Sequence, residues 1–333
     1  MQEARCWITT LFLLFIPDPV SGFFSEKPKM KIDDTPLSTA RRETLAGVLY
    51  AGTAFLIWGL SPVYWKAMQR VPALEIVTHR VVWSFLFLMG LTWFQHRWVE
   101  FKDVLKTPRT LMILALTTLL VSGNWLLYIW AVNSGYLLQA SLGYYINPLV
   151  NVLLGMVFLK ERLRRPQAIA VLLACAAVVF RTVSYGELPW IALTLGFTFG
   201  LYGLIRKVAP VSSLVGLAVE TLMLTPLGLA YLVFLEAHGS GALLHGSRAL
   251  DVLLIGTGVF TAVPLLCFNL GARRINLSTV GLMQYIAPSG MFLMAVLVYG
   301  EPFTSAQGWT FAMIWTALAI YSIDSVRTYR RTG

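Results

Sequence analysis

The feature that constrains the fold most is a series of ten apolar segments joined by short connections. They occupy residues 45–65, 74–94, 109–132, 137–159, 166–183, 187–205, 210–235, 249–271, 277–299 and 305–326. Each is close to the ~20 residues that a helix needs to cross a bilayer. The chain is 57% hydrophobic and 13% charged, whereas a soluble domain carries about 25% charged residues. The sequence therefore predicts an all-α membrane protein with ten transmembrane helices.

Residues 1–44 precede the first predicted span. The apolar run 7–16 is too short to cross a bilayer comfortably, and it fits either a signal-peptide core or an upstream extension. Met30 opens a polar lead of the kind that precedes a first spanning helix. We expect residues 1–44 to be a poorly ordered or mis-started extension, with residues 1–29 upstream of this lead, because little apolar surface is available there to fix it.

The net charge of +10 does not form a continuous basic patch, so nucleic acid is not an expected partner. Most Lys and Arg residues fall in alternate loops, and the opposite loops carry only Lys66, Arg70, Arg181 and Arg248. The positive-inside rule then predicts that both termini are cytoplasmic. The three cysteines have no paired spacing, and we expect no disulfide framework, no metal site and no cofactor.

An internal repeat is visible at an offset of 140 residues. The stretch 140–161 matches 280–301, so that Tyr145 aligns with Tyr285 and Pro148 with Pro288. Near the start of each half the offset is about 141, as for Gly59 and Gly200. Five predicted helices separate each element from its copy, and an odd number reverses the orientation in the membrane. The sequence thus predicts two inverted five-helix repeats, 45–183 and 187–331, of the kind that provide alternating access in transporters.

Several stretches also resemble a known family. They are FLIWGLSPVYWK (55–66), EIVTHRVVWS (75–84), GNWLLYIWAVNSG (123–135), ASLGYYINPLVNVLLG (140–155), VPLLCFNLGARR (263–274) and QYIAPSGMF (284–292). Over residues 45–331 the chain resembles the RarD-type permeases of the EamA branch of the drug/metabolite transporter superfamily. The resemblance implies a ten-helix fold of two inverted repeats in the bacterial inner membrane. It also implies proton-driven export.

Charged groups inside spanning helices are candidates for function, because each costs about 2.5–3.5 kcal/mol to insert. Arg80 aligns with Glu220 at the repeat offset. We hypothesise that they face a central cavity, where they pair with each other or contact substrate and proton; the alternative is a packing or topogenic role. Glu220 and His79 are the two candidates for proton coupling. The alternative for His79 is a hydrogen-bonded interior residue. Its one acidic neighbour at helical spacing is Glu75, four residues before it.

A polar and aromatic set is the candidate for substrate contact. It comprises Asn124, Trp125, Tyr128, Gln139, Tyr144, Tyr145, Asn147, Asn151, Gln284 and Tyr285. Aromatic rings can stack on flat cargo and amides can hydrogen-bond it, but amides also join helices in membranes and tyrosines also anchor interfaces. Pro148 and Pro288 are predicted helix breaks, serving either as hinges or as fixed kinks. We expect Tyr144, Asn147, Pro148, Tyr285 and Pro288 to line the cavity.

These features favour a secondary transporter, not an enzyme, that moves a small metabolite or drug-like compound. No nucleophile–base pair or phosphate-binding loop stands out in the sequence. A membrane-embedded enzyme acting on a lipid-linked substrate is the alternative, and a passive channel is less consistent with the repeat. The expected partners are a small-molecule substrate and the bilayer, with either a monomer or a homodimer.

Overall fold

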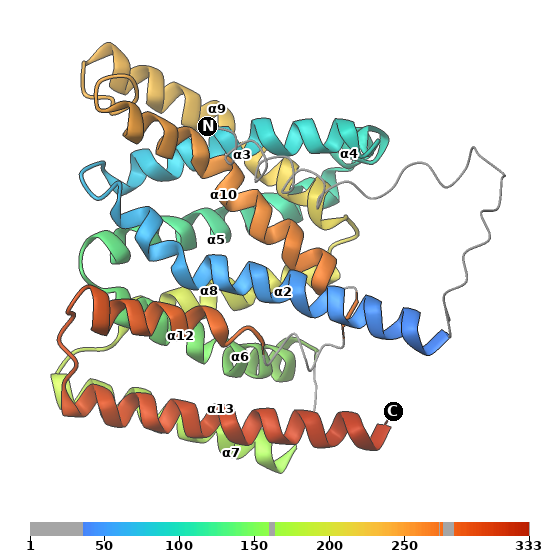
Figure 1. Ribbon diagram of the computed structural model, residues 1–333, viewed down its shortest axis with the longest axis vertical. Coiled ribbons are helices and arrows are strands. Elements are labelled where there is room, and N and C mark those ends of the chain that lie inside the picture. Colours follow the sequence, from blue (N-terminus) through green and yellow to red (C-terminus); the bar gives the residue numbers. More distant parts are fainter. Residues whose placement is uncertain (1–35, 160–163, 273, 276–282, 333) are drawn as a thin grey trace. The chain divides into compact units, whose positions relative to one another are not determined.

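The computed structural model describes residues 36–159, 164–272, 274–275 and 283–332. Every regular element within these ranges is helical, which confirms the all-α prediction for the described part of the chain. The helices are α2 (Pro36–Lys66), α3 (Ala73–Phe94), α4 (Trp98–Leu105), α5 (Pro108–Asn133), α6 (Leu137–Leu159), α7 (Arg165–Tyr185), α8 (Trp190–Val208), α9 (Ser213–Ala237), α10 (Arg248–Ala272), α12 (Ile286–Leu293) with the π-helical turn η1 (Met294–Val298), and α13 (Ser305–Thr332) (Figure 1).

Seven helices of the described part are long and apolar enough to cross a bilayer. They lie in α2, α3, α5, α6, α7, α9 and α10, while α8 and the segment Ile286–Val298 are shorter apolar helices. The chain is therefore a multi-pass membrane protein, and the number of ten spans stays a prediction. Residues 1–35 and the first residues of the predicted span 277–299 lie outside the described ranges. The predicted boundary at residue 44 falls inside α2, which begins at Pro36.

Local sequence explains several helix ends. Ser212 caps α9 by accepting a hydrogen bond from the backbone N–H of Val215 at 3.4 Å, which satisfies one of the free donors of the first turn. Pro108 opens α5, where its missing N–H has no intrahelical partner to lose. Gly186 ends α7 with a φ of 70°, a left-handed conformation that glycine adopts without strain.

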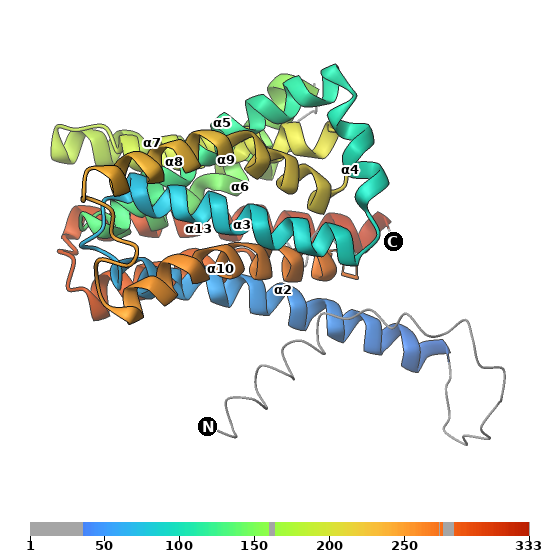
Figure 2. The same ribbon diagram turned by 90° about the horizontal axis from the view of Figure 1, so that it is seen from above.

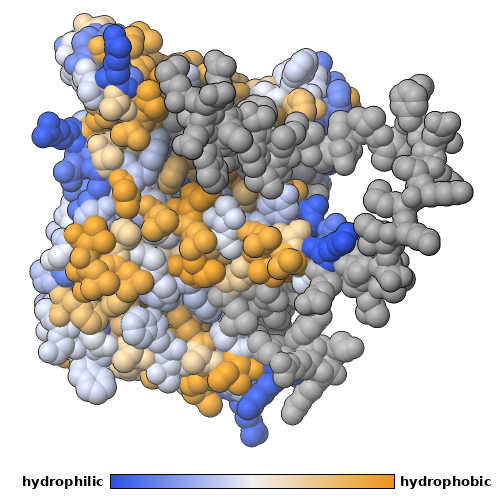
Figure 3. All heavy atoms as spheres, in the orientation of Figure 1, coloured by the Kyte–Doolittle hydropathy of each residue, from blue (hydrophilic) through white to orange (hydrophobic). Residues whose placement is uncertain are grey.

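Among residues 42–332, α3 packs against α9 and α10, α6 against α8 and α12, and α7 against α13. Figure 1 shows α7 and α13 side by side, and Figure 2 shows the same helices from above, partly behind others. Large apolar side chains remain exposed on several helices, such as Leu119 on α5, Val183 on α7 and Leu227 on α9, and Figure 3 shows apolar residues over much of one face. Exposed apolar surface of this extent is suited to contact with lipid.

The crossing of α3 and α10 depends on a glycine. A Cβ atom at Gly258 would lie 2.8 Å from the backbone nitrogen of Ser84 and closer still to the backbone of Trp83. The two helix backbones therefore approach so closely that only hydrogen fits between them, as is common in membrane helix packing. This contact fixes the position of α3, which carries His79 and Arg80.

Three glutamates bind backbone N–H groups of distant segments. Glu75 accepts from Ala242 at 2.6 Å, and Glu100 accepts from Ser212 at 3.0 Å. Glu301 accepts from both Leu137 and Leu138 at 2.8 Å, at the first turn of α6, where a carboxylate also favours the helix dipole. Burial raises the pKa of Glu301, although these two hydrogen bonds and the charge of Lys66 oppose the rise. Sequence reasoning assigned none of the three this role, because carboxylate-to-backbone bonds leave no sequence pattern.

Glu100 gives a pH-dependent prediction. Partial burial raises the pKa of Glu100, whereas hydrogen bonds from Ser212 and Arg97 and the charge of Arg97 lower it. Together the lowering effects outweigh burial, so the pKa of Glu100 lies below its ordinary value of 4.5. A carboxyl with a depressed pKa stabilises the fold above its unfolded pKa, and this contribution is lost as the pH falls through the folded value. We expect Glu100→Gln to lower the free energy of unfolding at pH 7 by up to about 1 kcal/mol, and the difference from wild type to shrink below about pH 4.

The measurement is unfolding of the purified protein in mild detergent at the two pH values. Asp103→Asn, an exposed change in the same helix, should alter stability at neither pH. A Glu100→Gln deficit that persists unchanged in acid would contradict the ionic contribution.

Candidate functional site

Polar and aromatic residues of α2, α3, α5, α6, α8 and α9 form three groups, whose members are buried or half-buried except for Asn151, which is exposed. The arginine cluster consists of Arg80, Trp65, Trp125, Tyr128 and Tyr144. The acidic cluster consists of Glu220, Thr117, Tyr202 and Arg206. The amide ladder consists of Asn124, Asn147 and Asn151 with their partners on α8.

The arginine cluster holds a cation among aromatic rings. The guanidinium carbon of Arg80 lies 3.9 Å from the ring centroid of Trp125 and 5.3 Å from that of Trp65, within the range of cation–π attraction. The rings of Tyr128 and Tyr144 meet edge to face at 5.6 Å, and the Tyr128 hydroxyl lies 2.8 Å from that of Ser61. Arg80 is 8% exposed, so the bilayer and bulk water hardly reach it.

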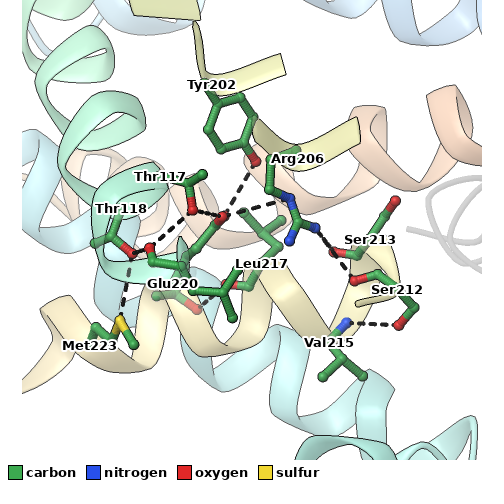
Figure 4. Close-up of polar contacts among 12 residues, drawn as sticks. Thr117, Thr118, Tyr202, Arg206, Ser212, Ser213, Val215, Leu217, Glu220 and Met223 are labelled. Carbon is green, nitrogen blue, oxygen red and sulfur yellow. Dashed lines mark hydrogen bonds and ion pairs between the residues drawn. The ribbon is translucent and has the colours of Figure 1, made fainter. Parts of the chain in front are cut away.

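The acidic cluster surrounds the buried carboxylate of Glu220 (Figure 4). Thr117 donates a hydrogen bond to its Oε1 at 2.6 Å, and Tyr202 donates to Oε2 at 3.3 Å. The Nε atom of Arg206 lies 3.7 Å from Oε1, and its Nη2 donates to the carbonyl oxygens of Ser212 and Ser213 at 3.4 Å. The carboxylate is thus paired and doubly hydrogen-bonded, as a buried charge requires.

The ion-pair partner of Glu220 is Arg206, not Arg80. α3 and α9 run antiparallel, because Gly228, late in α9, approaches Thr78, early in α3. Each helix carries its charge seven residues after its own first residue, so Arg80 lies roughly 10 Å along the axis from Glu220. Of the two roles proposed for this pair, direct mutual pairing is absent from the structure, and contact with substrate and proton stays a prediction.

The amide ladder ties α5 and α6 to α8. The Nδ2 atom of Asn124 donates to the Leu195 carbonyl at 3.0 Å and to the Thr198 hydroxyl at 2.9 Å, while Tyr144 donates to its Oδ1 at 3.3 Å. Asn147 donates to the Gly196 carbonyl at 3.1 Å, and Asn151 donates to Asn147 at 3.1 Å. The bonds of Asn124 and Asn147 to α8 correspond to the interhelical role, which was one of the two alternatives for the amides, whereas the Asn151–Asn147 bond lies within α6.

Replacement by leucine should therefore have opposite effects on stability at Asn147 and at Asn133. Asn147→Leu should lower the free energy of unfolding by about 1 kcal/mol, because it leaves the Gly196 carbonyl and the Asn151 amide without this partner. Both amide atoms of Asn133 are buried without a hydrogen bond among the described residues, so Asn133→Leu should be neutral or stabilising. Unfolding of the two variants in one detergent compares them directly, and equal effects would contradict the ladder.

Pro148 lies in α6 and Pro288 in α12, and these two helices pack against each other. Pro148 and Pro288 are both buried within their helices, and the Pro288 carbonyl accepts a hydrogen bond from Ser141 at 2.8 Å. Gln284 and Tyr285 are half-buried just before α12, and the hydrogen bonds of the described residues do not connect them to the amide ladder. For all four residues a cavity lining or a hinge remains a prediction.

His79 is almost fully buried, and its Nε2 atom lies 3.9 Å from the Glu75 carboxylate. Neither ring nitrogen has a hydrogen bond among the described residues, so His79 is an interior residue without the hydrogen bond expected of one. The Glu75 carboxylate is held by the backbone N–H of Ala242. Glu75, one helical turn before His79, is the acidic neighbour that helical spacing in the sequence predicted for it.

Neither of the two hollows described here contains the arginine or acidic cluster. The larger, of about 450 Å³, is an open apolar groove between α3, α5 and α8, lined by Ala73, Leu74, Gly123, Leu126, Leu127, Trp130 and Trp190. The smaller lies near Gln139 and Arg181. Arg80 is 8% exposed and Glu220 is 1% exposed, so both charged side chains are buried in this state. No group of three His, Cys, Asp or Glu side chains that could bind a metal occurs among the described residues.

Comparisons with known proteins agree on one family. Residues 45–183 match the EamA-like transporter family. Protein RarD of Salmonella typhi is 48% identical over 290 residues, covering 87% of this chain and 99% of the relative. An uncharacterized transporter of Vibrio cholerae is 48% identical over 287 residues, covering 86% of this chain and 95% of the relative. A crystal structure with 18% sequence identity and a TM-score of 0.52 covers 82% of this chain and 96% of that chain, which supports the fold alone. The chain therefore belongs to the RarD-type permeases of the EamA-like transporter family.

Proposed function

We propose that this protein is a proton-coupled secondary transporter that exports a small metabolite or drug-like compound across the bacterial inner membrane. Membership of the family makes it a membrane transporter. The observation that carries the finer proposal is a set of contacts that recur, with helix direction reversed, at the repeat offset of 140–141 residues. Such equivalence is expected of inverted repeats that rock about a central site.

The recurring contacts join the two proposed repeats. α3 packs against α9, α6 against α12, and α7 against α13, and each pair consists of equivalent helices. A Cβ at Gly290 would lie 3.0 Å from Gly59, and a Cβ at Gly200 would lie 3.0 Å from Val150. These two close approaches map onto each other at the repeat offset, which supports ten spans arranged as 45–183 and 187–331.

The two clusters are equivalent in the same sense. Trp65 aligns with Arg206 and Arg80 with Glu220, so the Trp65–Arg80 contact and the Arg206–Glu220 pair occupy corresponding places near opposite ends of α3 and α9. We assign them to two gates, of which one opens while the other stays closed. With both termini cytoplasmic, as the distribution of Lys and Arg supports, the Arg206–Glu220 gate faces the cytoplasm. Protonation of Glu220 would weaken its attraction to Arg206 and couple opening to the proton.

The substrate site lies between the gates, lined by Trp125, Tyr144, Asn124 and Asn147, with Asn151, Gln284 and Tyr285 nearby and with Pro148 and Pro288 as hinges. Uptake of a panel of metabolites and drugs into proteoliposomes with an imposed pH gradient tests the proposal. We expect at least one compound to accumulate saturably, only while the gradient persists. Chemical conversion of the compound would indicate an enzyme, and flux that neither saturates nor follows the gradient would indicate a channel.

A further inference from the structure

Arg80 has no acidic partner among the described residues. The buried carboxylates near the clusters bind other groups: Glu220 binds Thr117, Tyr202 and Arg206, and Glu75 binds Ala242. Glu301 is held by the first turn of α6. A guanidinium group is always protonated in proteins, so a full positive charge stays buried without a counter-ion. Arg206, the arginine of the acidic cluster, has Glu220 as its counter-ion.

Two N–H donors in the arginine cluster are also unused. The Nε of Arg80 and the Nε1 of Trp65 are buried and hydrogen-bond to nothing in the described part of the chain. Trp65 is 2% exposed, and its ring centroid lies 5.3 Å from the Arg80 guanidinium carbon. Tryptophan nitrogen and guanidinium nitrogens donate and never accept hydrogen bonds. The missing group is therefore an acceptor, and the uncompensated charge requires it to be negative.

The aromatic rings compensate the charge only in part. The faces of Trp125 and Trp65 attract the guanidinium, but this attraction is weaker than a charge-assisted hydrogen bond to an oxyanion. The same rings offer flat apolar surfaces on which a ligand body can stack.

We propose that Arg80 and Trp65 bind the anionic group of the substrate, and that this substrate is an organic anion whose oxyanion group is carried on an apolar or aromatic body. The proposal rests on the transporter function proposed above and assigns its substrate class. The oxyanion accepts hydrogen bonds from the Arg80 guanidinium and from Trp65 Nε1, while the body lies against Trp125 and Tyr144. Because the cluster is closed in this state, the anion enters when the gate at Trp65 opens.

The test is binding to the purified full-length protein in detergent, with two pairs of probes that differ in charge: phenylacetate with phenylacetamide, and phenyl phosphate with phenol. Thermal unfolding and quenching of tryptophan fluorescence report the binding. Wild type is expected to bind each anion at least about tenfold more tightly than its neutral partner, as the loss of one charge-assisted hydrogen bond implies. Arg80→Gln should lose this preference, and Arg80→Lys should retain part of it.

Arg70→Gln is the matched control, because Arg70 is exposed and the change removes the same charge; its preference should equal that of wild type. In the absence of ligand, Arg80→Gln should unfold at a temperature no lower than wild type, since it removes an uncompensated charge. Equal binding of the anions and neutral partners, no binding of either anion, or an anion preference that survives Arg80→Gln would each overturn the inference. Gradient-driven transport of a neutral compound that persists in Arg80→Gln would overturn it and leave the transporter function intact.

Discussion

Replacement of Glu220 by alanine is expected to abolish transport and to lower the free energy of unfolding by about 3 kcal/mol. The change leaves the Arg206 guanidinium, whose side chain is 12% exposed, without its counter-ion, and removes the acceptor of Thr117 and Tyr202. Breaking a buried ion pair on one side costs about 3–5 kcal/mol. The lower end applies because the pair is 3.7 Å long and Arg206 keeps its bonds to two carbonyl oxygens. Unfolding in mild detergent and proteoliposome uptake give the two readouts.

A double variant separates the effect of an unpaired charge on stability from the effect of losing the ion pair on transport. Glu220→Gln with Arg206→Gln should recover most of the stability lost in Glu220→Ala, because it leaves no charge unpaired, but it should not recover transport. Wild-type stability of Glu220→Ala would show that the pair contributes nothing to the fold.

Gly216 offers a way to disturb the pair without removing either charge. A Cβ atom at Gly216 would collide with the Arg206 guanidinium, which is the far end of a flexible side chain and can move away. Gly216→Ala should therefore displace Arg206 from Glu220 and reduce transport. It should lower the free energy of unfolding by no more than about 3 kcal/mol, because Glu220 loses its counter-ion but keeps the hydrogen bonds of Thr117 and Tyr202. Transport at the wild-type rate in this variant would argue against a gate at the Arg206–Glu220 pair.

The helices could be predicted closely from the sequence, because long apolar segments in a membrane protein leave few alternatives to a helix. The prediction 137–159 has the same bounds as α6, and 109–132 lies within one residue of α5 at each end. The short helix α4 was not predicted, since its eight residues Trp98–Leu105 are too few for a clear periodic pattern. The predicted first span began at residue 45 because hydropathy marks apolar residues, whereas α2 continues through a polar stretch to Pro36.

The sequence predicted which residues belong to the candidate site better than it predicted which of them contact each other. Arg80, Glu220, Asn124, Tyr144 and Asn147 all lie in the interior, as intramembrane polar groups are expected to do. The repeat offset suggested that Arg80 and Glu220 could pair, but equivalent residues of inverted repeats lie at opposite ends of antiparallel helices unless they sit near the symmetry axis. Arg206 is instead brought to Glu220 by the contact of two successive helices. A one-dimensional offset identifies which positions correspond, and only the three-dimensional packing decides which of them meet.

Gly258→Ala is expected to destabilise the protein by about 3 kcal/mol and to reduce transport. Overpacking a close contact costs about 1–3 kcal/mol, and the upper end applies because the added methyl meets the backbone of Trp83 and Ser84, which cannot rotate away as a side chain can. The strain would separate α10 from α3 and shift Arg80, four residues before Ser84. Unfolding in detergent and uptake by proteoliposomes measure both effects.

Gly90→Ala is the matched control in the same pair of helices. A Cβ at Gly90 would meet nothing within 4 Å, and alanine favours helix over glycine by up to about 1 kcal/mol, so this variant should be as stable as wild type or more so. If Gly258→Ala were as stable as Gly90→Ala, the backbones of α3 and α10 would have to lie farther apart than the crossing at Ser84 implies. The position of Arg80 would then depend on its aromatic neighbours alone, and its charge would be held in place by Trp125 and Trp65 without support from α10.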